Sequence, residues 1–77
     1  INPTSNMVFF RYADRPGVVG AVGNAFAGIN IGGMHIARDH EGGQALMAIT
    51  VDSAVNAALL DEVARTIGAD MARVVAL

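Results

Sequence analysis

The chain has 77 residues, of which 53% are hydrophobic and 16% charged, and its net charge is -2. This length allows one domain, close to the lower limit for a chain that must bury a core of its own. The negative charge and the lack of lysine argue against a nucleic-acid-binding protein, because such proteins neutralise phosphates with lysine and arginine. The absence of cysteine excludes disulfides, thiolate catalysis and cysteine-ligated metals, and it fits a cytoplasmic protein.

The hydrophobic content is high for so small a body, whose ratio of surface to volume is large. Apolar side chains must therefore reach the surface, and a contiguous exposed patch marks an interface. We expect a partner, and a second copy of the same chain first of all. No membrane association is expected, since no apolar run approaches the roughly 18 residues that span a bilayer. The sequence has no basic segment followed by an apolar stretch, so no signal peptide is expected.

Residues 1–5 are polar apart from an initial isoleucine, which predicts the remnant of a linker from a longer protein. The domain itself is expected over residues 6–77. Residues 7–12 (MVFFRY) are short and aromatic between polar neighbours, a pattern typical of a strand. Residues 18–26 carry apolar positions at spacings of three and four, which predicts an amphipathic helix that ends at Gly28.

Residues 29–39 predict a second strand, in which Gly32 and Gly33 mark a bulge or a close backbone approach. A turn then leads to residues 44–51 (QALMAITV). Large apolar residues alternate there with smaller ones, which predicts a strand buried on one face.

A second helix is expected next, capped by Asp52 or Ser53 and ended by Gly68. Its apolar stripe comprises Val55, Leu59, Val63 and Ile67. Residues 71–77 (MARVVAL) read as a last strand. The order β-α-β-β-α-β predicts a ferredoxin-like α+β fold, a four-stranded antiparallel sheet with two helices on one face.

Groups that could carry catalysis are few and poorly placed. His40 stands between Asp39 and Glu41 in a turn, which is typical of a solvated loop tip. His35 lies in the middle of a predicted strand, either half-buried or at an interface, or else as a ligand. No nucleophile–base pair and no third metal ligand stand at a useful spacing, so we expect neither a catalytic nor a metal site.

Glycines recur as G-x-x-G-x-x-G at Gly17, Gly20 and Gly23. This spacing differs from the dinucleotide-binding fingerprint, and the chain is too short for the doubly wound sheet that carries it. Close packing of the helix explains the glycines better, so no cofactor is expected in this domain.

The first strand–helix junction places a phenol and a carboxylate where a helix begins. Free N–H groups at such a helix start favour an anion. A zwitterionic amino acid needs a negative group for its ammonium, which Asp14 offers, and donors for its carboxylate, which the amides of residues 17–19 offer. The alternative is that Asp14 only caps the helix, with Pro16 in the first turn.

Three segments together resemble the ACT domain: Asp14-Arg15-Pro16-Gly17-Val18-Val19, then Gly28-Ile29-Asn30-Ile31, and Gly42-Gly43-Gln44-Ala45-Leu46-Met47. The resemblance covers roughly residues 6–77. Within this family the chain is most similar to the carboxy-terminal regulatory domains of bacterial D-3-phosphoglycerate dehydrogenases. The connection between Pro16 and Asn30 is somewhat shorter than is usual there, which would displace Asn30.

The resemblance implies a regulatory domain without catalytic residues, in a parent enzyme that uses NAD elsewhere. It implies a homodimer of side-by-side domains with L-serine, or another small amino acid, bound at the seam as a feedback inhibitor. The implied ligand contacts from one subunit are Tyr12, Asp14, Arg15, Pro16, Gly17, Val18 and Val19, and those from the other are Asn30 and Ile31. Asn30 has a second interpretation, as a turn residue that ends the helix–strand connection.

Two other functions are considered. The chain could be an ACT-like assembly module that dimerises and has lost its ligand. It could also be an RNA-binding domain of the same fold, which would need exposed aromatics on the middle strands of the sheet. The second and third predicted strands contain no aromatic residue, so this last function is set aside.

Overall fold

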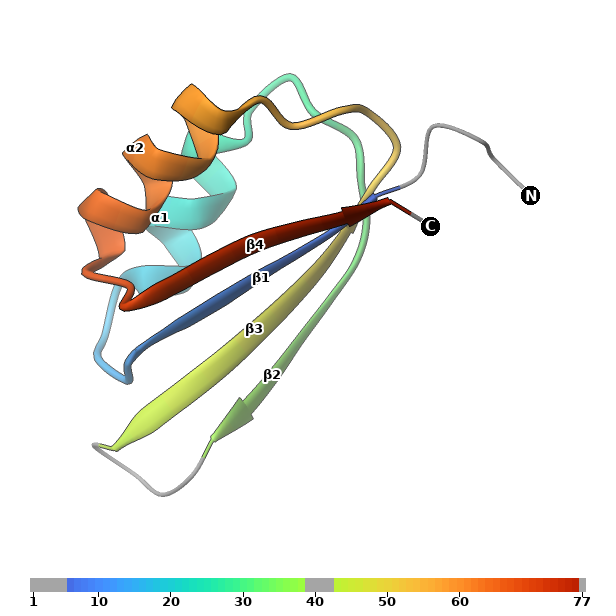
Figure 1. The fold of residues 1–77 in the computed structure, drawn as a ribbon. Helices are drawn as coiled ribbons and strands as arrows, with labels where there is room; N and C mark the ends of the chain where they lie inside the picture. Colours follow the sequence, from blue (N-terminus) through green and yellow to red (C-terminus); the bar gives the residue numbers. More distant parts are fainter. Residues whose placement is uncertain (1–5, 39–42, 77) are drawn as a thin grey trace.

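The computed structural model describes residues 6–38 and 43–76. The elements in chain order are β1 (Asn6–Ala13), α1 (Val18–Ala25), β2 (Ile31–Arg38), β3 (Gln44–Val51), α2 (Ala57–Ile67) and β4 (Met71–Ala76). The predicted βαββαβ order is confirmed, and both helices cover the same face of the sheet (Figure 1). The predicted linker at residues 1–5 and the turn that carries His40 lie outside the described residues.

The sheet has the strand order β2-β3-β1-β4, and every neighbouring pair is antiparallel. The first strand of the chain is therefore one of the two central strands, and β2 and β4 form the two edges. Since β1 and β2 both run antiparallel to β3, they point in the same direction. The end of β1 and the end of β2 consequently lie at the same end of the sheet.

The core lies between the sheet and the helices. Residues of β3 alternate as the sequence predicts, and every second one is buried under the helices. In β1, Val8, Phe10 and Tyr12 are buried in the same way. Phe10 of β1 contacts Phe26 just after α1, with ring centroids 6.4 Å apart and ring planes tilted by 35°. The buried set is Val8, Phe10, Tyr12, Val18, Val22, Phe26, Ala45, Met47, Ile49, Val51, Val63 and Ile67.

Helix α1 begins at Val18, within the predicted segment, and it ends before the predicted end at Gly28. Its N-cap is Gly17, in a left-handed conformation with φ of 89° and no side-chain cap, so the predicted cap by Asp14 is wrong. Pro16 precedes the helix rather than joining its first turn, because proline keeps the residue before it extended and Gly17 then reverses the chain. The helix ends at Ala25, and Phe26 follows as its C-cap.

Helix α2 is capped by Asn56, whose side chain accepts a hydrogen bond of 2.7 Å from the Leu59 amide. The predicted cap by Asp52 or Ser53 is wrong, because Asp52 is held at the end of β3 and the chain needs several more residues to cross to the helix layer. The predicted end at Gly68 is confirmed, with φ of 69°.

The predicted bulge is confirmed. The register of β2 against β3 shifts between Ile31 and Gly33, so Gly32 is the extra residue. The strand itself begins at Ile31 rather than at residue 29.

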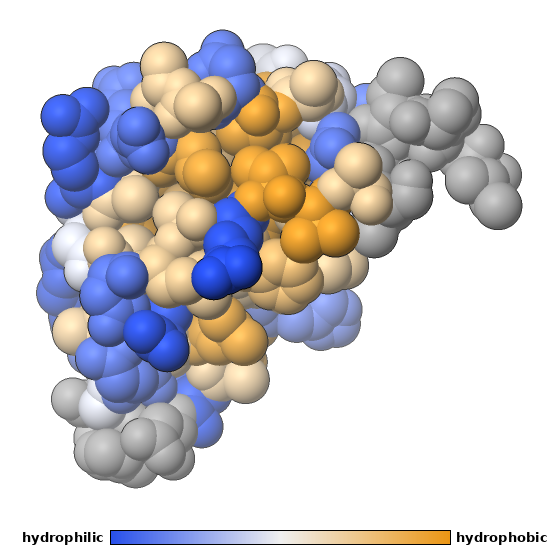
Figure 2. All heavy atoms as spheres, in the orientation of Figure 1, coloured by the Kyte–Doolittle hydropathy of each residue, from blue (hydrophilic) through white to orange (hydrophobic). Residues whose placement is uncertain are grey.

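Apolar side chains reach the surface on both edge strands, in line with the composition. Ile36 of β2 is 39% exposed and Val75 of β4 is 47% exposed. Figure 2 shows apolar atoms gathered over the path of β4, with hydrophilic atoms at the margins and a hydrophilic group in their midst. Both edges therefore carry apolar surface that a partner could cover.

Candidate functional site

The predicted site residues of the first junction gather at the end of β1. Tyr12 on β1 and Arg38 on β2 both pair with Ala45 of β3, so the three residues form one row across the sheet. Tyr12 is only 2% exposed and lies in the row that the helices cover. Ala45 between them carries only a methyl group, which leaves space above β3 for the long side chain of Arg38.

Asp14 lies just beyond this row and forms an ion pair with Arg38. The distance from Arg38 Nε to Asp14 Oδ2 is 3.2 Å. The Asp14 side chain is 15% exposed and that of Arg38 is 61% exposed. The Asp14 amide donates a hydrogen bond of 2.8 Å to the Gly43 carbonyl, which fixes the backbone there. A largely buried, fixed carboxylate thus faces a cation on a long, solvent-exposed arm.

The residues between Asp14 and the helix form the rest of the junction. Val18 is buried in the core, whereas Val19 on the next position is 46% exposed. The N-cap, Gly17, has no side chain that could bond the first N–H groups of α1, and such groups at a helix start favour an anion. Arg15 extends to the other helix, where its guanidinium lies 3.7 Å from the position a Cβ on Gly68 would take. A cation at this C-terminal end of α2 interacts favourably with the helix dipole.

Asn30 and Ile31 lie at the opposite end of the sheet. Ile31 pairs with Val51 at the start of β2, where Asn6 of β1 pairs with the same residue. The Asn30 side chain donates a hydrogen bond of 2.7 Å to Asp52 Oδ2. The backbone carbonyl of Asn30 accepts a hydrogen bond of 3.1 Å from the backbone amide of Asp52. Within one chain, Asn30 therefore closes the end of the β2–β3 pair and cannot reach Asp14.

Arg38 is a site residue that sequence reasoning missed. Along the chain the five arginines look scattered, but four of them (Arg11, Arg15, Arg38 and Arg65) lie at the end of the fold where β1 finishes. Arg11 pairs there with Asp70 at 3.0 Å. The signal that could have found Arg38 is its spacing of two and four residues from Ile36 and Met34, which places it on the helix-covered face.

The pKa of Tyr12 depends on its burial and on the charges of the site. Burial of the phenol raises its pKa above the ordinary value of 10.0, the Asp14 carboxylate raises this pKa further, and the Arg38 guanidinium lowers it. Tyr12 is the only tyrosine, and there is no tryptophan. Its phenolate absorbance therefore reports on this site alone.

We expect an alkaline absorbance titration of the domain to give a midpoint above 10.0 for Tyr12. The folded state binds the phenolic proton more tightly than the unfolded state does, so the free energy of unfolding should fall as the pH rises from 10.0 toward the raised pKa. Asp14→Asn removes the second cause and should lower the midpoint relative to the wild-type protein. A midpoint at or below 10.0 in the folded protein would contradict the described burial.

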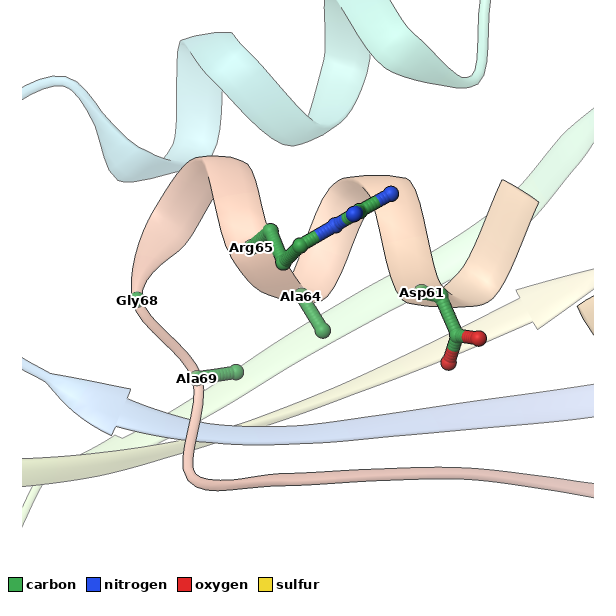
Figure 3. A pocket seen from close by; sticks show the side chains of 5 residues that line it. All are labelled: Asp61, Ala64, Arg65, Gly68 and Ala69. Atoms are coloured by element: carbon green, nitrogen blue, oxygen red, sulfur yellow. The ribbon is translucent and has the colours of Figure 1, made fainter. Parts of the chain in front are cut away.

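Two hollows lie near this end of the fold. One of about 430 Å³ is lined by Asp61, Ala64, Arg65, Gly68 and Ala69, and Figure 3 shows the Asp61 and Ala64 side chains pointing from α2 toward the strands. The other, of about 320 Å³, is lined by Arg11, Ala37, Arg38, Gln44, Ala45 and Leu46. Of these two, only the second includes residues of the row beside Asp14, namely Arg38 and Ala45.

Neither a metal cluster nor a membrane helix is found over residues 6–38 and 43–76. No three histidine or acidic side chains meet there in a way that could hold a metal ion. Nor is any helix in these ranges long and apolar enough to cross a membrane. His35 is exposed on the side of the sheet away from the helices, rather than half-buried, and His40 lies outside these ranges.

Comparison with known families gives a match to the ACT domain over residues 6–68. The chain belongs to the ACT domain family. The matched range of this ACT domain includes both groups of predicted site residues, those of the first junction and those at the start of β2.

One sequence relative and two solved structures are similar to this ACT domain. A D-3-phosphoglycerate dehydrogenase from Synechocystis sp. is 30% identical over 70 residues, which are 88% of this chain and 13% of that protein. A formyltetrahydrofolate deformylase from Pseudomonas putida KT2440 superposes with a TM-score of 0.76 at 14% identity, over 95% of this chain and 29% of that one. The C-terminal domain of the MgtC protein from Mycobacterium tuberculosis superposes with a TM-score of 0.72 at 13% identity, over 99% of this chain and 89% of that one. The two structures share the fold, and the chain spans a small part of the dehydrogenase.

Proposed function

We propose that this ACT domain binds a small amino acid, L-serine first among them, and that a second copy of the domain completes the site. The observation that carries the proposal is the Asp14 carboxylate, which is largely buried, fixed through its backbone, and directed toward a cation. An α-ammonium group is a cation of the right charge for this place. The uncapped N–H groups at the start of α1 are donors for the α-carboxylate beside it.

The positions of Asn30 and Ile31 support a dimer through β2. In one chain they lie a full strand away from Asp14, roughly 25 Å at the usual rise per residue. Strand β2 is a free edge of the sheet, so two copies can pair their β2 strands antiparallel about a two-fold axis. This pairing brings the start of β2 in one copy next to the end of β2 in the other. Asn30 of one subunit then stands near Asp14 of its partner.

The parent protein, in this proposal, is a bacterial D-3-phosphoglycerate dehydrogenase of the cytoplasm, controlled by feedback from L-serine. The similarity to the Synechocystis sp. dehydrogenase supports this. NAD and the catalytic groups belong to other parts of such an enzyme, and the domain should bind neither NAD nor 3-phosphoglycerate. Serine at the seam regulates the enzyme if it binds one arrangement of the two subunits more tightly than another.

Calorimetry with the Asp14→Asn variant tests the ligand site. We expect L-serine binding to weaken about tenfold or more, because the charge-assisted bond to the ammonium is lost. The free energy of unfolding should change by less than about 1 kcal/mol, since the lost ion pair has an exposed partner and Asp14 caps no helix.

Asp70→Asn is the matched control, because it removes another carboxylate that pairs with an arginine at this end of the sheet. Its serine affinity should equal that of the wild-type protein. Wild-type protein that dimerises without binding any amino acid would favour the alternative, an ACT-like assembly module that has lost its ligand. Unchanged serine affinity in Asp14→Asn would instead assign recognition to the backbone amides.

A further inference from the structure

The Asp14 site is already occupied in the free domain, by a side chain of the same chain. Arg38 is the last residue of β2, and its Nε lies 3.2 Å from Asp14 Oδ2, where an ammonium group would have to bind. The two side chains differ in how far solvent reaches them. Asp14 is 15% exposed, whereas Arg38 is 61% exposed. Of the two, the guanidinium is the group that can move.

We propose that Arg38 is a ligand-binding residue that leaves Asp14 and, together with the N–H groups at the start of α1, binds the carboxylate of the incoming amino acid. This inference rests on the proposed function and deepens it. The charges balance in both states. Before binding, one carboxylate faces one guanidinium; after binding, Asp14 faces the ammonium and Arg38 faces the carboxylate.

The surroundings of Arg38 allow this movement. Its cross-strand neighbour is Ala45, which carries only a methyl group, and the Arg38 side chain is 61% exposed. No large or charged side chain of β3 stands in its row, so the arm can turn without displacing the core. Guanidinium binds carboxylate in a two-pronged geometry that lysine cannot offer.

The exchange makes the domain selective for zwitterions. A ligand with an ammonium group but no carboxylate must compete with Arg38 for Asp14, and it offers the displaced guanidinium no new partner. An amino acid displaces Arg38 and at once provides it with a new partner. Arg38 therefore opposes simple amines and favours amino acids, so its removal should change the two affinities in opposite directions.

The test compares L-serine with ethanolamine, which is serine without its carboxylate, on the wild-type protein and on Arg38→Gln. Calorimetry is expected to show serine binding to Arg38→Gln at least tenfold more weakly than to the wild type. Ethanolamine is expected to bind several-fold more tightly, because its competitor is gone. The matched control is Arg73→Gln, which removes an exposed arginine of β4 and should change neither affinity.

Tyr12 gives a second readout that needs no ligand. Arg38 lowers the phenol pKa, so the midpoint of the phenolate titration should rise in Arg38→Gln, which also shows that the variant is folded. Serine binding of wild-type affinity in Arg38→Gln would overturn the exchange and leave the proposed function standing. Tighter binding of both compounds would overturn it as well, and would make Arg38 a competitor only. A wild-type protein that binds no serine would overturn the proposed function and the exchange together.

Discussion

Phe10→Ala is expected to lower the free energy of unfolding by about 3–5 kcal/mol. Phe10 is fully buried on a central strand and contacts Phe26 across the core. Truncation loses the transfer free energy of the ring and leaves a cavity that the sheet and helices cannot close. A domain of this size has roughly 5–15 kcal/mol of stability in all, so the variant should be partly unfolded near body temperature. Denaturant unfolding at one fixed protein concentration measures the difference.

Phe9→Ala is the matched control, because Phe9 is the neighbouring residue of the same strand and faces away from the helices. It is half-buried and pairs with Ala48 and Arg73. Its truncation should cost about 1 kcal/mol, since it buries less area and opens no cavity. Equal losses for Phe9→Ala and Phe10→Ala would contradict the described alternation of β1.

Ile36→Lys is expected to raise the dissociation constant of the proposed dimer at least ~100-fold, which corresponds to about 2.8 kcal/mol. Ile36 is exposed on the edge strand β2, and the two-fold axis would bring two new lysines to one seam. Inward-facing charge on an edge strand opposes pairing with a second sheet. Sedimentation should show a monomer near 8 kDa, and serine binding should fall with dimerisation because Asn30 of the partner is lost.

Val75→Lys is the matched control on the other edge. Val75 has a similar exposure on β4, so the substitution has the same chemistry at the opposite edge of the sheet. This variant should remain a dimer and bind serine as the wild-type protein does. The reverse result, a dimeric Ile36→Lys and a monomeric Val75→Lys, would place the seam on β4.

The sequence predicted the fold well because its signals are local and repeated. Alternation along residues 44–51 places every second residue of β3 in the core, and Gly68 ends α2 in the conformation that glycine favours. The helix starts were predicted less well. Asp14 and Asp52 have the right side chains for caps, but ion pairing and hydrogen bonding with residues distant in sequence hold both elsewhere.

The candidate site could be predicted only in part. Asp14 and Tyr12 stand out at a strand–helix junction, and the structure places them together. Arg38 could not be assigned to Asp14 from the sequence, because their contact depends on β1 and β2 flanking the same strand, β3. The RNA-binding alternative was judged on the wrong strands for the same reason. The middle strands are β1 and β3, and Phe9 of β1 is the aromatic residue on the helix-free side of that pair.

The central position of β1 has a consequence for how the domain is made. Among the strands of this domain, β1 is synthesised first, and its two neighbours in the sheet are β3 and β4. Strand β3 follows only after α1 and β2, and β4 follows only after α2 as well. During synthesis both edges of the apolar segment MVFF therefore remain unpaired until those strands are made. Of the strand pairs in this sheet, only β2–β3 joins strands that are consecutive in the chain. Such a nascent chain is exposed to aggregation until its last strand emerges, and it folds at a rate set by long-range contacts.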